Sequence, residues 1–391
     1  MTKLKDITGK ALSGEWGTDD ETGVGIPVLR TTNFTNEGIV NYENVVTRII
    51  TKKDISEKYL QSGDIIIEKS GGSDKQPVGR VIYFDGPENT YLFNNFTGLL
   101  RVRDKNEWFP RYVFYSLFAN YKKGGTRPFE NKTTGLHNLK TDDYVSRYEI
   151  TEIPLNKQVA ICAQLDQILK VINLRRKEIS NLDDLIKARF VEMFGDNQEV
   201  HKLSDIAAIT GGLTKNSRRD KLELRKPYIR VANVFFASID TTEILDIGLT
   251  KEEYEKTLLR NGDLLFVEGN GSPDQIGRVA IWNGEIEDCV HQNHLIKARF
   301  DLKRMNPVFA MYYFISERGR NQIKKRAVST SGLYTLSVSK IADFEIPNPP
   351  MELQQQFAAF VAAIDKSKAT VQKALDETQL LFDSLMQQYF G

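Results

Sequence analysis

The stretch GDIIIEKSGGS at residues 63–73 carries the side chains best suited to catalysis. Two carboxylates, Asp64 and Glu68, could bind Mg²⁺ at a phosphodiester, and Lys69 could stabilise the charge that develops there. A metal nuclease, however, typically has an acid followed by Glu-x-Lys, whereas here glutamate and lysine are adjacent. The similar stretch GDLLFVEGNGS at 262–272 reads Val267-Glu268 at this point. We therefore expect Asp64 and Asp263 to cap turns before strands. A metal-dependent DNA nuclease that uses Asp64 and Glu68 is the alternative to this structural role.

Other motifs that could support catalysis are incomplete. NPPM at 348–351 is similar to a motif of amino-methyltransferases, but Met351 is not aromatic and no glycine-rich cofactor loop precedes it. His291 and His294 would point to opposite faces of a strand, so we do not expect them to share a metal. Phosphate-loop and serine-nucleophile motifs are absent. The sequence therefore indicates neither an enzyme acting alone nor a metal site.

The two similar stretches belong to an internal repeat with a period of about 196–199 residues. Four further motifs recur in the same order: KLKDI (3–7) as KLSDI (202–206), IPVLRTTNF (26–34) as KPYIRVANV (226–234), YLFNNFTGLLRVR (91–103) as CVHQNHLIKARF (289–300), and NKTTGLHNLK (131–140) as VSTSGLYTLS (328–337). Because chance does not place five motifs in register, we interpret the chain as a duplication.

Each copy begins with about 150 residues of mixed structure. Short apolar runs such as DIIIE and VIYF, or DLLFVE and VAIW, are bounded by Gly, Pro and Asn and predict strands. Apolar spacing predicts a helix near 110–121 and another near 307–323. This part of each copy is therefore expected to be α+β with a mainly β core.

Each copy ends in 40 residues without proline or glycine, 155–194 and 351–390. Apolar residues recur at alternating steps of four and three, a period of 3.5 that indicates a coiled-coil seam. We assign this seam to Ile161, Leu165, Ile168, Ile172, Ile179, Leu182, Ile186, Phe357, Val361, Ile364, Val371, Leu375 and Phe382. A 40-residue helix is about 60 Å long, too long for one small domain to cover. We expect the two helices to bury their seams against each other, antiparallel. Arg175, Arg189, Lys368 and Thr378 interrupt the pattern.

These patterns predict four segments: a domain at 1–154, a helix at 155–195, a second domain at 196–350 and a second helix at 351–391. The expected fold class is α+β, with two mixed α/β globular domains joined by an antiparallel coiled coil and related by a pseudo-two-fold repeat. Prolines 154 and 350 mark the boundaries between domain and helix.

The polar residues of the repeated loops are of the types that read duplex DNA. Lys and Arg contact phosphates, whereas Asn, Gln, Ser, Thr, His and Arg can contact base edges. The shared glycines and Gly-Arg-Val would hold the backbone, and the residues that differ would read different bases. Our candidate DNA contacts are Arg30, Asn33, Lys69, Ser70, Ser73, Asn94, Asn95, Arg127, Lys132, Thr133, Thr134, His137, Lys140, Arg230, Asn233, Asn270, Ser272, Gln292, Asn293, His294, Lys325, Arg326, Ser329, Thr330, Ser331 and Tyr334.

Composition sets limits on this interpretation. The net charge is +1, so no overall basic character supports nucleic-acid binding, but Lys and Arg concentrate at 121–140 and 317–340, matching places in the repeat. No run of 18 or more apolar residues occurs, and no secretory signal is recognisable, so we expect a cytoplasmic protein without membrane contact. Cys162 and Cys289 have no close Cys or His partner at metal spacing, which favours free thiols.

Taken together, the chain resembles the specificity subunit of Type I restriction–modification systems over essentially its whole length. The resemblance rests on two variable globules, the repeated TGLHNLK/SGLYTLS and GD…GRV elements, and helices entered through IPLNKQVAICAQLDQI and PPMELQQQFAAFVAAI. Gln158 and Gln355 stand where family members often carry glutamine.

The resemblance implies that each globule reads one half of a bipartite site in double-stranded DNA. The coiled coil would set the spacer and dock methyltransferase subunits, two of them, and restriction/translocase subunits would join. The resemblance implies no cofactor in this chain: S-adenosylmethionine, ATP and Mg²⁺ would be bound by the partner subunits. A rival interpretation is a protein-interaction scaffold without DNA, but such a scaffold predicts similar loop chemistry in both copies, and the polar positions diverge.

Overall fold

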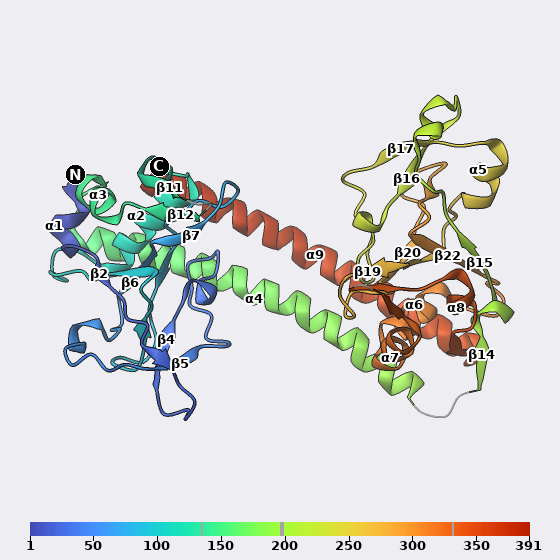
Figure 1. Cartoon of the computed structure of the whole chain (residues 1–391), viewed down its shortest axis with the longest axis horizontal. Helices are drawn as coiled ribbons and strands as arrows, with labels where there is room; N and C mark the ends of the chain where they lie inside the picture. The colour runs from blue at the N-terminus through green and yellow to red at the C-terminus, as the bar shows by residue number, and fades with distance from the viewer. Residues whose placement is uncertain (134–135, 196–198, 331) are drawn as a thin grey trace. The chain divides into compact units, whose positions relative to one another are not determined.

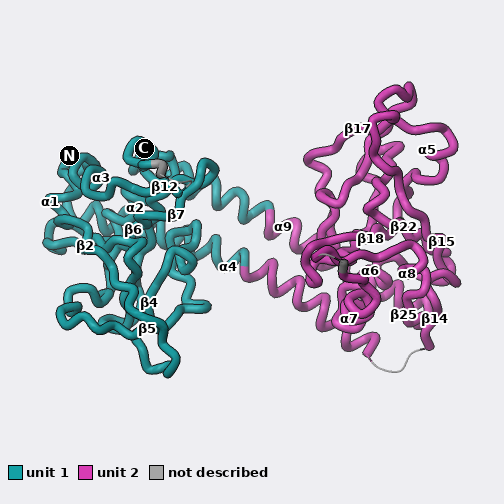
Figure 2. The backbone as a smooth tube through the Cα atoms, viewed as in Figure 1, with its two compact units in different colours: residues 1–176, 373–391 teal, residues 177–372 magenta. Residues whose placement is uncertain are grey.

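The computed structural model describes residues 1–133, 136–195, 199–330 and 332–391. The chain divides into two compact units, teal and magenta in Figure 2. Unit 1 comprises Met1–Arg176 and Lys373–Gly391, and unit 2 comprises Lys177–Gln372. Two long helices, α4 (Leu155–Phe194) and α9 (Met351–Phe390), are each continuous and contribute residues to both units. Their bounds confirm the two 40-residue helices predicted from the sequence.

Unit 1 is built on an antiparallel sheet in the order β2-β10-β6-β8. Its central strand β6 carries Ile65, Ile66 and Ile67, all fully buried, because both faces of the strand are covered. Helix α2 (Pro110–Lys122) packs against β8, with the rings of Tyr83 and Phe114 5.6 Å apart. The strands of this sheet and of its two companions, β3-β5-β4-β9 and β11-β12-β7, are β2 (Leu12–Ser13), β3 (Thr18–Asp19), β4 (Ile26–Leu29), β5 (Val46–Ile49), β6 (Ile65–Glu68), β7 (Ser70–Gly72), β8 (Val81–Tyr83), β9 (Leu92–Phe93), β10 (Thr97–Leu100), β11 (Glu130–Thr133) and β12 (Leu136–Leu139).

Unit 2 repeats this plan. Its antiparallel sheet β15-β22-β18-β20 corresponds to β2-β10-β6-β8, and β19-β24-β23 corresponds to β7-β12-β11. A third sheet, β17-β16-β21, contains a parallel pair, as its counterpart does between β4 and β9. The strands are β15 (Ala207–Gly211), β16 (Arg225–Ile229), β17 (Leu245–Gly248), β18 (Asp263–Val267), β19 (Gly269–Asn270), β20 (Val279–Trp282), β21 (Val290–His291), β22 (Leu295–Phe300), β23 (Val328–Thr330) and β24 (Leu333–Thr335). The duplicated α+β architecture expected from the sequence is therefore confirmed.

The remaining elements close each unit. In unit 1, β1 pairs with β13, and in unit 2, β14 pairs with β25, so the beginning of each copy is tied to the strand just before its long helix. Short helices complete the two copies. The bounds are β1 (Thr2–Lys3), α1 (Leu4–Thr8), α3 (Thr141–Arg147), β13 (Glu149–Ile150), β14 (Val200–Lys202), α5 (Lys251–Thr257), α8 (Val338–Ala342) and β25 (Glu345–Pro347).

The helix predicted near 307–323 is wrong in one respect, because it is two helices. Helix α6 (Pro307–Ile315) ends at Ser316, and α7 (Glu317–Arg326) begins after it. Ser316 has an extended backbone, and its hydroxyl accepts a hydrogen bond from the Gly319 N–H at 3.4 Å. A serine in this role caps a new helix, so the apolar spacing continues while the helix axis does not.

Within unit 1 the ends of α4 and α9 pack antiparallel. The Tyr389 hydroxyl donates to Gln164 Oε1 at 3.0 Å, while Arg175 donates to the Thr378 hydroxyl. Position 164 thus lies opposite 389, and 175 opposite 378, so the two sequences run in opposite directions. Arg175 and Thr378, which interrupt the apolar pattern, satisfy each other across the seam. The predicted seam residues of unit 1 are buried or half-buried: Ile161, Leu165, Ile168, Ile172, Leu375 and Phe382.

The same pairing occurs within unit 2. Lys368 Nζ lies 2.5 Å from Asp183 Oδ1, and the Phe190 and Phe357 rings are 5.3 Å apart. Lys368, another interruption of the seam, is therefore neutralised by the facing helix. The predicted seam residues here are also buried or half-buried, namely Ile179, Leu182, Ile186, Phe357, Val361, Ile364 and Val371.

A buried glutamine anchors the first turn of each long helix to its globule. In unit 1, Gln158 Oε1 accepts from the Phe109 N–H at 2.8 Å, and its amide donates to Ile153 and Glu107 carbonyls at 2.9 Å. In unit 2 the equivalent residue is Gln354, whose Oε1 accepts from the Asn306 N–H at 2.8 Å. The sequence-based match to Gln355 is therefore wrong by one position, since Gln355 is exposed. Two neighbouring glutamines are indistinguishable until the helix phase is known.

Replacing Gln354 by alanine is expected to destabilise unit 2 by about 1–3 kcal/mol, because the Asn306 N–H and the Pro349 carbonyl lose their partner. Gln355→Ala, one residue further along the same helix, is the matched control and should change the free energy of unfolding by less than about 0.5 kcal/mol. Urea unfolding of both variants makes the comparison. Equal destabilisation by the two substitutions would contradict the anchoring role of Gln354.

Candidate nucleic-acid interface

Three of the predicted DNA-reading segments of unit 1 meet around one small sheet (Figure 1). Strand β7 pairs with β12, placing Ser70 opposite Asn138, and β12 pairs with β11. The N–H groups of Lys69 and Ser70 both donate to the Phe96 carbonyl, at 2.8 and 3.3 Å. The loop that carries Asn95 therefore lies directly against the start of β7, although about 25 residues separate the two in sequence.

Unit 2 brings the corresponding segments together in the same way. Strand β19 pairs with β24, and β24 pairs with β23. The Glu268 N–H donates to the His294 carbonyl at 2.9 Å, and the Leu336 N–H donates to the Glu268 carbonyl at 2.8 Å. The glycine-rich loop, the Gln292–His294 segment and the 328–335 hairpin strands thus adjoin one another. The same backbone arrangement thus supports loops of different sequence in the two units.

A fourth predicted segment joins this surface in each unit. The Asn94 N–H donates to the Leu29 carbonyl at 3.0 Å, and the Gln292 N–H donates to the Ile229 carbonyl at 3.0 Å. Arg30 and Arg230 follow these carbonyls directly, so each arginine stands next to the loop that carries Asn94 or Gln292. Their guanidinium groups are half-buried and donate to backbone carbonyls, Arg30 to Asn44 and Arg230 to Glu243.

Asn33 and Asn233 have internal roles. Each is buried, and its amide oxygen accepts the backbone N–H of the arginine three residues earlier, at 3.0 and 2.9 Å. The amide nitrogen of each donates to two carbonyls, those of Asn41 and Glu43 or of Asp240 and Glu243. Both amide hydrogens are used inside the fold and the side chains are buried, so neither asparagine is retained as a candidate DNA contact.

Asn94 and His137 are also used inside the fold. Asn94 is 4% exposed, and its side-chain oxygen accepts from the Thr97 hydroxyl at 3.2 Å. His137 is 5% exposed, with Nδ1 2.9 Å from Glu130 Oε2. A polar side chain that is almost completely buried and hydrogen-bonded within the fold supports the loop that presents its neighbours. We therefore remove these two residues from the set as well.

The other candidates keep exposed or half-exposed side chains. In unit 1 these are Lys69, Ser70, Ser73, Asn95, Arg127 and Lys140, and in unit 2 they are Asn270, Ser272, Gln292, Asn293, His294, Lys325, Arg326, Ser329 and Tyr334. Burial lowers the pKa of Lys69, whose ammonium group donates to the Ser13 hydroxyl at 2.9 Å. Only the backbone is described for Lys132, Thr133 and Thr330, and Thr134 and Ser331 lie outside the described residues.

The carboxylates suspected of binding metal are held by arginines. Asp64 receives two hydrogen bonds from Arg101, each 2.7 Å long, and Asp263 receives two from Arg299, at 2.7 and 2.6 Å. Each aspartate also accepts the N–H of the residue three positions earlier, at 2.7 Å, which is the predicted turn-capping role. Bidentate pairing to arginine uses both carboxylate oxygens, so the metal-nuclease alternative loses its first ligand.

The remaining motif with metal-ligating residues is divided between core and surface. His291 is buried, with Nδ1 3.0 Å from the Thr257 carbonyl, and burial lowers its pKa to about 4. His294 is exposed and lies 3.2 Å from Glu268. Across the described ranges, no group of three or more His, Cys, Asp or Glu is arranged to hold a metal ion. The helices in those ranges likewise include none long and apolar enough to cross a membrane.

The glutamate at the end of the central strand has a different partner in each unit. In unit 1, Glu68 is buried and pairs with Arg80 of Gly-Arg-Val, whose Nη2 lies 3.0 Å from Glu68 Oε1. In unit 2, Arg278 occupies the matching place but donates to the Val231 carbonyl at 3.2 Å, and Glu268 faces His294 instead. The repeated frame therefore presents different charges beside its loops.

Sequence reasoning missed one group of exposed cations, which lies on a segment that begins beside this surface. Lys215, Arg218 and Lys221 lie on the segment that follows β15, which reads TKNSRRDKLELRK at 214–226. The available signal was its charge, but the matching segment of the first copy is acidic. The motifs shared by the two copies therefore do not point to it.

Comparison with known proteins agrees with this geometry. The family model for the Type I restriction modification DNA specificity domain matches residues 1–183 and again 195–378. The chain belongs to this family. It is accordingly a DNA specificity subunit of a type I restriction–modification system and not a catalytic one.

Individual relatives are distant. The EcoKI specificity subunit of Escherichia coli K12 and the StySPI specificity subunit of Salmonella potsdam are each 22% identical over 393 residues, covering 93% of this chain and 80% of each relative. The MjaX specificity subunit assigned to Methanocaldococcus jannaschii is 27% identical over 229 residues, which is 57% of this chain and half the length of that relative.

Solved structures share the fold. The S subunit of a Type-I restriction-modification system from M. genitalium superposes with a TM-score of 0.54 at 16% identity, covering all of this chain and 95% of that one. A chain from a structure of type I R-M complex assembly and conformational transition gives 0.56 at 14% identity, covering all of this chain and 96% of that one. The order of duplicated globule and long helix is thus a property of the family fold.

Proposed function

We propose that each unit reads one half of a bipartite, asymmetric site in double-stranded DNA. The observation that carries this proposal is the convergence of the same four segments on the same β frame in both units, with different polar residues on them. A shared frame fixes the approach to the groove, and differing side chains specify different bases. In this proposal the recognition domains are 1–154 and 196–350, and the helical segments are 155–195 and 351–391.

The proposed base contacts come from residues that are exposed or half-exposed at the converging loops. Asn95 and Ser73 in unit 1, and Asn270, Gln292 and Asn293 in unit 2, have the amide or hydroxyl groups that suit base edges. Lys and Arg of the same loops would bind phosphates and supply the part of the affinity that does not depend on sequence. The near-zero net charge of the chain is compatible with DNA binding, because the partner subunits can add phosphate contacts.

The two long helices would set the distance between the half-sites and dock the partner subunits. A helix has a fixed rise per residue, so it transmits a length that a flexible linker would not. The partners we propose are two methyltransferase subunits, which bind S-adenosylmethionine, and restriction/translocase subunits, which use ATP and Mg²⁺. The complex would act on DNA in the cytoplasm and direct adenine methylation or restriction.

Methylome sequencing tests this function directly. Cells without any other adenine methylation system would carry this chain together with its methyltransferase subunits. The expected result is one split motif with adenine methylated in both halves and a constant number of unspecified bases between them. Omitting this chain is the control and should abolish the modification. A continuous motif, or modification that persists without the chain, would contradict the proposal.

Asn293→Ala is expected to relax specificity in the half-site read by unit 2 only. Loss of one good base contact costs about 1–3 kcal/mol of discrimination at one position, a factor of about 5–150. Asn293 is half-exposed, and its backbone N–H, which remains in the variant, donates to the Leu213 carbonyl at 2.9 Å. Binding to duplexes substituted base by base in each half-site gives the measurement. A uniform loss on every duplex would instead assign Asn293 to phosphate binding or folding.

A further inference from the structure

The segment after β15 in unit 2 is strongly basic. Between Thr214 and Lys226 the chain has six cations, Lys215, Arg218, Arg219, Lys221, Arg225 and Lys226, against the two acids Asp220 and Glu223. The segment begins beside the proposed reading surface, because the Leu213 N–H donates to the His291 carbonyl and the Asn293 N–H donates to the Leu213 carbonyl, each at 2.9 Å.

The matching segment of unit 1 has the opposite charge. Gly14 and Gly212 occupy equivalent places, since a Cβ at either would collide with the carbonyl oxygens of the adjoining strand, at 2.2 Å or at 2.3 Å. Residues 15–26 after Gly14 include four acids, Glu15, Asp19, Asp20 and Glu21, and no lysine or arginine. The two units therefore have opposite charge at one defined place in the repeat.

The acids of unit 1 are largely neutralised within that unit. Glu15 pairs with Lys58 and with Lys52, the latter at 2.7 Å, and Asp19 pairs with Arg48. Asp20 accepts backbone N–H groups of its own loop. This segment accordingly serves the internal structure of unit 1.

Arg219 holds the basic segment of unit 2 in one conformation. Its side chain is buried, and its Nε donates to the Thr214 carbonyl at 2.6 Å and its Nη1 to the Gly248 carbonyl at 3.0 Å. Both terminal nitrogens reach Glu253, at 2.9 and 2.8 Å, and this pairing lowers the pKa of the Glu253 carboxyl. The turn Ser217–Lys221 is thereby tied to the start of α5.

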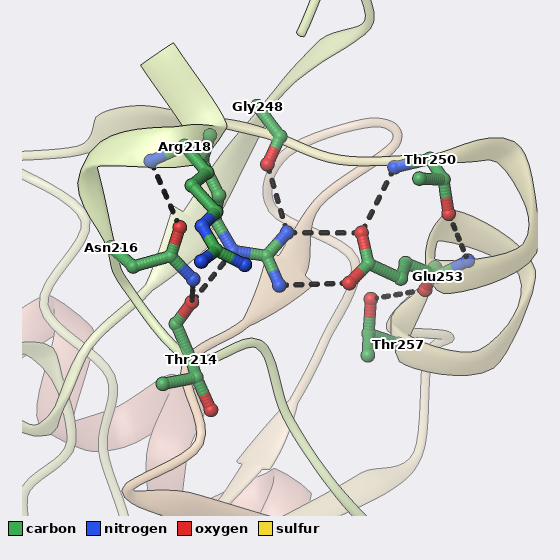
Figure 3. Close-up of polar contacts among 8 residues, drawn as sticks. Thr214, Asn216, Arg218, Gly248, Thr250, Glu253 and Thr257 are labelled. Carbon is green, nitrogen blue, oxygen red and sulfur yellow. Dashed lines mark hydrogen bonds and ion pairs between the residues drawn. The ribbon is translucent and has the colours of Figure 1, made fainter. Parts of the chain in front are cut away.

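Two local caps complete this support. Asn216 accepts the Arg218 N–H at 3.0 Å, and Thr250 exchanges hydrogen bonds with Glu253 at 3.2 and 2.9 Å, as Figure 3 shows. Glu253 is therefore oriented from its own helix before it meets Arg219. A turn fixed in this way presents its outward side chains with little loss of backbone freedom on binding.

The cations of the basic segment differ in whether they are neutralised. Lys226 pairs with Asp288 at 2.5 Å, and Arg225 donates to the Asp246 carbonyl at 3.2 Å. Lys215, Arg218 and Lys221 are exposed, and none has an ion-pair partner among the residues that the structure describes. They combine positive charge without an ion-pair partner, a rigid supporting turn and a place on a segment that begins beside Asn293.

We propose that Lys215, Arg218 and Lys221 bind the DNA phosphates that flank the half-site read by unit 2, and that unit 1 has no counterpart of this contact. The inference rests on the proposed function and adds an asymmetry to it. Unit 2 supplies more of the sequence-independent affinity, while unit 1 depends more on its reading loops. Cations held on a rigid turn bind phosphates and release condensed counterions, which makes their contribution strongly dependent on salt.

The test uses the complex of this chain with its methyltransferase subunits and a variant with Lys215→Gln, Arg218→Gln and Lys221→Gln. Dissociation constants are measured for the cognate duplex and for an unrelated duplex across a range of salt concentrations. The slope of log K against log salt is negative. We expect its magnitude to decrease by about 3, roughly 0.9 for each phosphate that the variant no longer neutralises. Affinity for both duplexes should weaken by the same factor, so the ratio between them stays unchanged.

Lys303→Gln, which removes one exposed lysine elsewhere in unit 2 and outside the long helices, is the control for loss of charge alone and should leave the slope nearly unchanged. Thermal unfolding checks that each variant is folded. If the triple variant does not fold, Arg218→Gln alone replaces it, and the expected decrease in the magnitude of the slope is then about 1. An unaltered slope would overturn the inference while the proposed function stands. A change confined to the cognate duplex would also overturn it, since the residues would then read bases. Failure of the unmodified complex to prefer its cognate duplex would overturn the proposed function itself, and the inference with it.

Discussion

Lengthening both α4 and α9 by one heptad is expected to shift the preferred DNA spacer to a longer value and to leave both half-sites unchanged. Insertion after Arg176 and after Gln372 places the extra residues where each helix passes from one unit to the other. Seven residues add about 10.5 Å to a helix, the rise of about three base pairs. Seven also preserves the 3.5-residue period, so the seams on either side keep their facing partners.

The measurement is the affinity of the complex for a series of duplexes in which only the spacer length varies. We expect the optimum to move by no more than about three base pairs and the original duplex to lose the contribution of one half-site. A heptad inserted in α4 alone is the control. This single insertion would separate either Arg175 from Thr378 or Asp183 from Lys368. It should therefore lower stability without creating a new optimal spacer length. An unchanged optimum in the double insertion would show that the helices do not set the spacer.

Asp263→Ala is expected to destabilise unit 2 by about 3 kcal/mol, a factor of more than 100 in the folding equilibrium. Asp263 is 1% exposed, accepts two hydrogen bonds from Arg299 and caps the preceding turn through the Arg260 N–H at 2.7 Å. The substitution leaves the Arg299 guanidinium without its counterion and that N–H without an acceptor. Arg299 is partly solvated, which keeps the cost near the lower end for such pairs.

Trp282 provides a specific measurement, since it is the single tryptophan of unit 2, is buried, and lies opposite Asp263 in the β18–β20 pair. With Trp16 and Trp108 replaced by phenylalanine, fluorescence during urea unfolding reports unit 2 alone. Asp246→Ala, an exposed aspartate of the same unit, should change the free energy of unfolding by less than about 0.5 kcal/mol. Equal effects of the two substitutions would argue against a structural role for the Asp263–Arg299 pair.

The duplicated plan and the long helices could be predicted because their signals are local. A run of 40 residues without proline or glycine, with apolar residues every 3.5 positions, has few alternatives to a helix that buries one stripe. Asp64 and Asp263 could be assigned to turns for the same reason, since a residue that caps a turn acts within three positions of itself. Ser316 shows the limit of such local signals. The apolar spacing around it predicts one helix, but its extended backbone divides the segment into α6 and α7.

The candidate site was harder to predict, because an asparagine in a loop can either face DNA or satisfy the backbone. Asn33 and Asn233 turned out to be internal, while Asn293 keeps an exposed face. The difference lies in carbonyl groups seven to ten residues away along the chain, which become neighbours only when the loop folds back. Periodicity and composition contain no information about such partners.

Sequence alone was enough to establish two unlike copies of one domain, each followed by a long helix, and the family to which such a chain belongs. Which glutamine anchors the second helix, which loops adjoin, and which of the described cations lack an ion-pair partner depended on the folded backbone. The physical reason is that a buried polar group is stabilised by whichever partner the fold brings within hydrogen-bonding distance. Arg219 illustrates this, because its partner Glu253 lies 34 residues further along the chain.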